Sequence, residues 1–406
     1  ATFKQSCLIL MALLLIFFFT KTFAQNIVDE ASTNLAANPA KLTETDFSEF
    51  ILVQASHKMP ASAKARRISE KLEKHAIEFL DGFPWKPFQH TIGISGYEVY
   101  FEHPAEVFYS LSLARPYLSP RTSGRAKSIL SALLTNSPPW SLEGSERSAG
   151  TPRESYDVPP NLRLKGRAPM SSAFGVYAFW SYCNAFNDVA AARHNWSVVR
   201  DRMQPLLATK YKFEIHKRDY NHDEVEILNG DLAGLLGLSR LAKLTQDSKT
   251  EQLALRKARE LLQLRVDFER VNAQILEKSS ASTKHLHYYK LSRFCNLTFE
   301  TAEALRKLSA GCAAGRLKPF REERNGWFIA YGDRFIGGEN YTSPPHLARA
   351  LFTGAALIEE LPSDELFGFV DVPWCKGDLF FMEKCVYALW ADSGRNWEKA
   401  TGEPVR

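Results

Sequence analysis

The pattern of apolar and polar residues is that of amphipathic helices through most of the chain. Apolar positions recur three and four residues apart, with charged residues on the opposite face. Alternation typical of strands is confined to residues 212–216 and 327–335. The sequence therefore predicts a mostly all-α fold. One expected helix begins at Pro104. The others cover residues 63–80, 124–135, 171–185, 188–207, 223–244, 249–278, 299–308, 346–361 and 378–391.

Two long irregular segments interrupt the predicted helices, at residues 81–103 and 137–169. Both contain glycines and prolines, which are typical of loops. A loop as long as 137–169 within a compact domain is usually functional or disordered. Antiparallel helices with long loops favour an (α/α)n toroid or barrel of helical hairpins over a four-helix bundle. No repeat of tetratricopeptide or ankyrin type is visible. No strand leads into a glycine-rich nucleotide-binding loop, and we expect no cofactor.

The N-terminus has the three-part layout of a signal peptide. Lys4 precedes an unbroken apolar run at residues 8–19, and Thr22-Phe23-Ala24 follows before Gln25. The run is shorter than the roughly 20 residues that span a bilayer as a helix, which disfavours the alternative of a retained anchor. We expect residues 1–24 to be removed and residues 25–406 to form a single catalytic domain. The protein would then be secreted or periplasmic, with no membrane attachment after cleavage.

Charge and cysteine content narrow the function only slightly. The formal net charge of +5 falls to +3 without Lys4 and Lys21, which is too small to indicate a nucleic-acid partner. The cysteines after residue 24 are odd in number and lack CxxC spacing, so no zinc site is expected. Two alternatives fit this cysteine content: one or two disulfides, or five buried thiols. The sequence does not determine the oligomeric state. These cysteines are Cys183, Cys295, Cys312, Cys375 and Cys385.

A first group of candidate residues lies on the predicted helix at 223–244 and just before it. At 100° per residue, one stripe is apolar and another combines small and polar side chains. The second stripe could line a cavity, with His222 and Glu226 as catalytic residues and Asn229 as a substrate ligand. Alternatively, its glycines only permit close helix packing. The stripe consists of His222, Glu226, Asn229, Gly230, Ala233 and Gly237.

A second group lies in residues 284–293, where two histidines and two tyrosines stand among three cations. The spacing His-x-His only weakly suggests a metal, because no acidic residue is near, and we expect no metal. The mixture suits β-elimination on a uronic acid, which needs a carboxylate-neutralising cation, a base and an acid. Tyr289 is the first candidate for acid and base and Tyr288 the second, while Arg293 and His287 would bind substrate.

Further substrate-binding candidates lie at the end of the helix at 171–185 and in residues 327–346. Asn187 and Trp180 belong to the first region, although capping of the next helix is an alternative role for Asn187. Glu339, Asn340 and Tyr341 belong to the second, in a loop that could overhang a cleft. If the enzyme is a hydrolase, Glu226 would form its carboxylate pair with Glu339 or with Asp333.

With these residues, the chain resembles the α/α-toroid carbohydrate-active enzymes, particularly the alginate and glucuronan lyases, and more distantly the unsaturated glucuronyl hydrolases. In such lyases an Asn or His and an Arg bind the uronate carboxylate while a Tyr is acid and base. The resemblance implies that the residues of these types in this chain are Asn187, His222, Arg293 and Tyr289.

The resemblance implies a secreted polysaccharide lyase whose partner is an acidic polysaccharide or oligosaccharide. A glycoside hydrolase of the same architecture with paired carboxylates is the first alternative. A non-catalytic periplasmic glycan-binding protein is the second.

Overall fold

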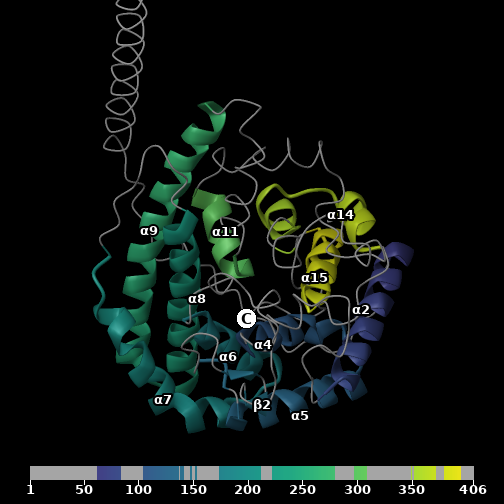
Figure 1. Ribbon diagram of the computed structural model, residues 1–406, viewed down its shortest axis with the longest axis horizontal. Coiled ribbons are helices and arrows are strands. Elements are labelled where there is room, and N and C mark those ends of the chain that lie inside the picture. The colour runs from purple at the N-terminus through teal and green to yellow at the C-terminus, as the bar shows by residue number, and fades with distance from the viewer. Residues whose placement is uncertain are drawn as a thin grey trace, which may run out of the picture.

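The computed structural model describes residues 62–83, 104–136, 138–140, 147–148, 151–152, 173–211, 222–278, 297–308, 349, 352–371 and 379–394, and nearly all of these are helical (Figure 1). The helices are α2 (Ala63–Asp81), α4 (Pro104–Ala114), η1 (Arg115–Tyr117), α5 (Pro120–Asn136), α6 (Phe174–Ala185), α7 (Val189–Ala208), α8 (His222–Thr245), α9 (Ser248–Lys278), α11 (Phe299–Leu308), η6 (Gly354–Ile358), α14 (Ser363–Val370) and α15 (Phe380–Asp392). The predicted all-α class is confirmed.

Helix positions follow the predictions closely, with three differences. Helix α5 starts at Pro120 rather than at residue 124, because Ser119 accepts the Thr122 amide at 3.3 Å and proline suits the first turn. Residues 354–358 form a π-helix. Helix α14 was not predicted, since its eight residues are too few to show a period. The strands expected at 212–216 and 327–335 lie outside the described residues, and the irregular segment 137–169 contains a two-residue ladder of β1 (Arg147–Ser148) and β2 (Thr151–Pro152).

The helices are arranged in two layers that share one hydrophobic core. Helices α4, α6 and α8 contact one another in sequence, and α15 contacts α4. In Figure 1 these four lie on the inside of an arc formed by α2, α5, α7 and α9. The two ends of the described chain meet where α2 packs on α14 and α15. There Ser62 Oγ donates to Asp392 at 3.2 Å, and Lys71 pairs with Asp371 at 2.8 Å.

Two of the helical hairpins are joined by turns of the same kind, in which a residue with positive φ precedes an Asp. Asn187 and Gln246 have positive φ angles of 51° and 66° and end α6 and α8, respectively. The next residues, Asp188 and Asp247, donate their amides back into the preceding helix and begin the following one. Each Asp side chain accepts an amide three residues ahead, at 3.0 and 3.1 Å. The cap of α7 is therefore Asp188, and Asn187 instead ends α6.

Close packing of α6 and α8 accounts for part of the small-residue stripe on α8. A Cβ placed on Gly237 would lie 2.5 Å from the Cα of Tyr177. The contact is between backbones, so no side-chain rotation could relieve it. At this position the stripe packs against α6, as in the close-packing alternative, and does not line a cavity.

Gly237→Ala is expected to lower the free energy of unfolding by about 1–3 kcal/mol, because α6 and α8 must separate. Gly124→Ala is the matched control, since no atom lies within 4 Å of a Cβ at that exposed helical position. It should raise the free energy of unfolding by up to about 1 kcal/mol through helix propensity. Urea unfolding of both variants tests this, and equal effects would contradict it.

Candidate functional site

Four of the helices that the structure describes carry a buried glutamate within their first two turns. These glutamates are Glu106 on α4, Glu226 on α8, Glu300 on α11 and Glu383 on α15, with exposed fractions between 0% and 7%. The positive end of the helix dipole favours a carboxylate at such a position. Full burial of a charge, however, also requires a cation or hydrogen-bond donors. The partners of each glutamate therefore determine its chemistry.

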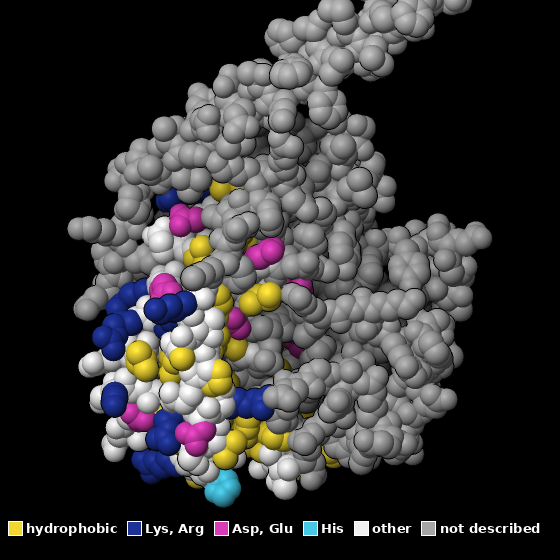
Figure 2. Space-filling view, turned by 60° about the vertical axis from the view of Figure 1, so that its left-hand side comes forward, with side chains coloured by type: hydrophobic (Ala, Val, Ile, Leu, Met, Phe, Trp, Pro, Cys, Tyr) yellow, Lys and Arg dark blue, Asp and Glu magenta, His cyan; other side chains and the backbone are white. Residues whose placement is uncertain are grey.

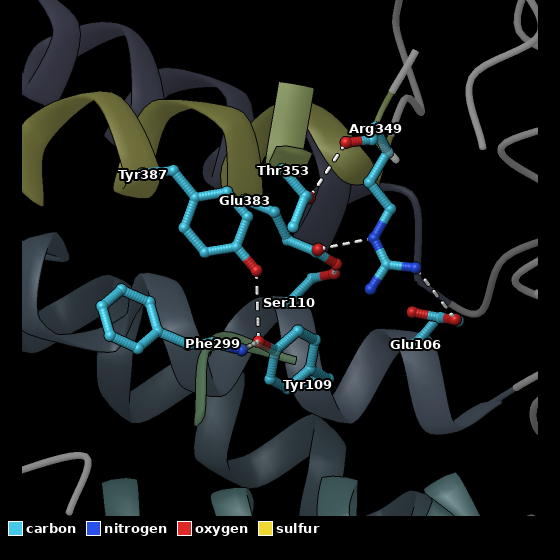
Figure 3. Close-up of polar contacts among 8 residues, drawn as sticks. All are labelled: Glu106, Tyr109, Ser110, Phe299, Arg349, Thr353, Glu383 and Tyr387. Atoms are coloured by element: carbon cyan, nitrogen blue, oxygen red, sulfur yellow. Dashed lines mark hydrogen bonds and ion pairs between the residues drawn. The ribbon is translucent and has the colours of Figure 1, made fainter. Parts of the chain in front are cut away.

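Arg349 holds two of these glutamates together (Figure 3). Its Nε lies 2.7 Å from Glu383 and its Nη1 lies 3.4 Å from Glu106. The second oxygen of Glu383 accepts a short hydrogen bond from Ser110, one turn after Glu106 on α4. The side chains of Arg349 and both glutamates are at most 1% exposed. We call Glu106, Ser110, Arg349 and Glu383 the carboxylate cluster.

The two carboxylates of the cluster have different surroundings. Burial, which exceeds the opposing effect of Arg349, raises the pKa of Glu106 to about 7. Its Oε2 atom is buried and has no hydrogen-bond partner among the residues that the structure describes. Glu383 has two hydrogen-bond donors, one to each oxygen. Burial opposes the charge on Arg349, but Glu106 and Glu383 more than offset this and raise its pKa. Because its pKa is about 7, Glu106 can carry a proton near neutral pH.

Two tyrosines lie beside the carboxylate cluster and connect it to α11. The hydroxyls of Tyr109 and Tyr387 are 3.2 Å apart, and the Phe299 amide donates to Tyr109 at 3.4 Å (Figure 3). Burial, together with nearby ionisable groups, raises the pKa of both tyrosines. A phenol with a raised pKa stays protonated, so neither can act as a base at neutral pH.

Further buried polar contacts join α8 to α11 and to α9. Glu300 pairs with Arg240 at 2.6 Å and so joins α11 to α8. On the hairpin of α8 and α9, Arg265 donates to Asn229 at 2.8 Å and pairs with Glu269 at 2.8 Å. Asn229, a predicted substrate ligand, is 1% exposed and accepts from a side chain of its own hairpin. Glu226 lies one turn before Asn229 on α8.

Two other predicted ligands have structural roles in this conformation. Trp180 is 2% exposed, and its ring centroid lies 5.1 Å from that of Tyr177. It is a core residue, so the burial of its ring disfavours stacking on a sugar. Asn187 is exposed, and its left-handed backbone ends α6.

The residues predicted for β-elimination are for the most part not described. His222 begins α8, but its side chain is not described. The remaining predicted residues lie outside the described part of the chain, so their convergence stays a prediction. They are His287, Tyr288, Tyr289, Arg293, Asp333, Glu339, Asn340 and Tyr341.

The carboxylate cluster was not found from the sequence, although a signal exists. Glu106 is the only acid of α4, and Glu383 lies in the mainly apolar helix α15, whose other charged residues are Lys384 and the terminal Asp392. An acid surrounded by apolar residues on every helical face must be buried, and a buried acid needs a partner. The partner itself could not be identified, because Arg349 is 243 residues from Glu106.

Comparisons of the chain with protein-family models, curated proteins and solved structures find no match. Among the described residues, no three His, Cys, Asp or Glu side chains are grouped so that they could hold a metal ion. None of the helices in those residues is long and apolar enough to cross a membrane. The function must therefore be inferred from the site itself.

Proposed function

We propose that this protein is a secreted enzyme that cleaves a uronic-acid-containing glycan by hydrolysis, with Glu106 as the proton donor. The observation that carries the proposal is the unequal pair of carboxyls on Arg349. A glycosidase needs one carboxyl that is protonated near neutral pH and a second that is ionised. Glu106 has the raised pKa of the acid, and Glu383 accepts from Arg349 and Ser110 as an ionised carboxylate would.

The helix contacts support an (α/α) toroid as the architecture of this enzyme. Helix α4 contacts α6, α6 contacts α8, and α8 contacts α11. Helix α11 contacts η6, η6 contacts α15, and α15 returns to α4. A cycle of this kind, with α2, α7 and α9 packed against its members, is what a ring of helical hairpins requires. The carboxylate cluster would lie on the inner helices of that ring.

Catalysis at this site requires an opening step. Glu106 and Glu383 are 1% and 0% exposed, so a glycan reaches them only after neighbouring chain moves aside. Enzymes often couple such a movement to substrate binding, which also excludes water from the reaction. Burial of Glu106 in the closed form is the cause of its raised pKa, and the same burial would be restored around a bound glycan.

β-Elimination is the alternative reaction, and it rests on the tyrosine and arginine residues at 288–293. It needs a base that removes a proton beside the uronate carboxylate, and Tyr289 remains the candidate because Tyr109 and Tyr387 stay protonated. A glycan-binding protein without catalysis is the remaining alternative. Hydrolysis, elimination and binding without catalysis are distinguished by the products that appear.

The mature protein, residues 25–406, should be incubated with alginate, glucuronan and a neutral glucan. New reducing ends without ultraviolet absorbance are expected, because hydrolysis leaves no double bond. Reducing ends accompanied by the absorbance of a 4,5-unsaturated uronate would show that the reaction is elimination and not hydrolysis. Retention of the polymer by the protein without any new reducing end would overturn both reactions and leave the binding protein.

A further inference from the structure

A groove lies on the outer layer, where the end of α7 meets the second and third turns of α9. It is open to solvent and has a volume of about 620 Å³, within the range of small-molecule binding sites. Figure 2 shows Lys and Arg side chains gathered on the face of the molecule that carries this layer. The groove is separate from the carboxylate cluster, since its lining residues lie on neither α4 nor α15 and do not include Arg349.

The cations of the groove are unevenly paired. Lys257 is bound to Glu260 at 2.8 and 2.9 Å, and its Nζ lies 5.3 Å from the centre of the Tyr211 ring. Lys210 and Arg256 are exposed and form no ion pair with any residue that the structure describes. Among its described lining residues, the groove therefore presents two positive charges without an ion-pair partner, while the one acid, Glu260, is paired with Lys257.

Apolar surface accompanies these charges. Leu207 and Leu253 line the groove, and Leu253 is 36% exposed. The Tyr211 ring is partly exposed and held in place, because its hydroxyl is hydrogen-bonded to Asp231 on α8 at 2.5 Å. A fixed aromatic ring and leucine side chains suit the C–H faces of a sugar, and cations suit its carboxylate.

We propose that this groove is a binding subsite for a uronate residue of an acidic glycan, with Lys210 and Arg256 binding the carboxylate. Tyr211 and Leu253 contact the sugar ring. The subsite rests on the proposed function for the class of its ligand, but it does not depend on the carboxylate cluster. It would hold the polymer on the outer layer while another stretch of the same polymer is cleaved, so that tight binding and cleavage reside in different residues.

The test compares two double variants of the mature protein by isothermal titration with alginate oligosaccharides at low salt. Lys210→Ala with Arg256→Ala should raise the Kd about tenfold, from the loss of two exposed charge contacts. Arg193→Ala with Lys249→Ala is the matched control. It removes the same charge from exposed positions of α7 and α9 outside the groove, and should leave the Kd unchanged.

Equal Kd values for the groove variant and the wild type would overturn the subsite. Equal weakening by both double variants would also overturn it, since binding would then reflect net charge alone. Wild-type affinity should fall as salt rises, and a neutral glucan should bind at least tenfold more weakly. Far-ultraviolet circular dichroism checks that both variants fold. Because the readout is binding, a protein that fails to cleave any glycan can still confirm or overturn the subsite.

Discussion

Replacement of Glu106 by glutamine is expected to lower kcat for glycan cleavage by about a hundredfold or more, the usual contribution of a general acid. Glutamine has the shape of the protonated carboxyl but cannot release a proton. Its side chain still offers an oxygen to Arg349, so the fold should be retained. The measurement is the rate of reducing-end formation at saturating substrate, on the glycan that the wild type cleaves.

Glu300→Gln is the matched control, because Glu300 is also a buried helix-start glutamate paired with an arginine, but its partner is Arg240 rather than Arg349. It should change stability without the loss in kcat. Equal kcat for Glu106→Gln and the wild type would exclude Glu106 as the acid, whichever glycan is cleaved.

The pH dependence follows from the same carboxyl. Because the pKa of Glu106 is raised to about 7, wild-type activity should fall as pH rises through 7 and the acid loses its proton. The free energy of unfolding should also fall as pH rises. Between about pH 4.5, its ordinary pKa, and 7, the folded state holds a proton that the unfolded state has lost, so stability falls with rising pH. Glu106→Gln should remove this part of the slope, which urea unfolding at pH 5 and pH 7.5 measures.

Replacement of Arg349 by methionine is expected to lower the free energy of unfolding by about 3–5 kcal/mol, because it leaves buried carboxylates without their cation. Methionine keeps much of the volume, so the loss reflects charge more than an empty space. The effect should be smaller at pH 5 than at pH 7.5, since Glu106, whose pKa is about 7, then carries a proton. Urea unfolding at the two pH values measures it.

A compensated variant separates this explanation from simple loss of packing. Arg349→Met combined with Glu106→Gln and Glu383→Gln removes the uncompensated charges and should recover most of the lost stability. Arg200→Ala, at a partly exposed pair with Asp201 on the outer layer, should change stability by less than about 1 kcal/mol. If the triple variant is no more stable than Arg349→Met alone, the charge argument is wrong.

Helix positions could be predicted because their signals are local. Residues 299–308 were predicted and found as α11, and α9 begins within one residue of its predicted start. Hydrophobic period, proline and capping residues all lie within a few positions of the boundary that they determine. The turn residues Asp188 and Asp247 follow the same logic, although the positive φ of Gln246 has no strong sequence signal.

The carboxylate cluster could not be predicted because its contacts are distant in sequence. Glu106 and Glu383 lie on different helices, and their shared partner Arg349 lies on neither. Charged residues are mostly exposed in proteins, so a sequence pattern favours sites in polar segments and loops. Tyr289 and Arg293 are candidates because of their types and their proximity in the chain, which indicate chemistry without placing it in the fold.

The location of α15 has a consequence for how the protein is made. The hairpins of α6 with α7 and of α8 with α9 use contacts between chain neighbours, so they can form rapidly while synthesis continues. The bond from Ser110 to Glu383 instead spans 273 residues, and α2 can meet α15 only when the C-terminal part has emerged. The slow step of folding is therefore expected to be the docking of α15. A chain released early would keep its hairpins, but Glu106 would lack the buried surroundings that raise its pKa, on which the proposed hydrolysis depends.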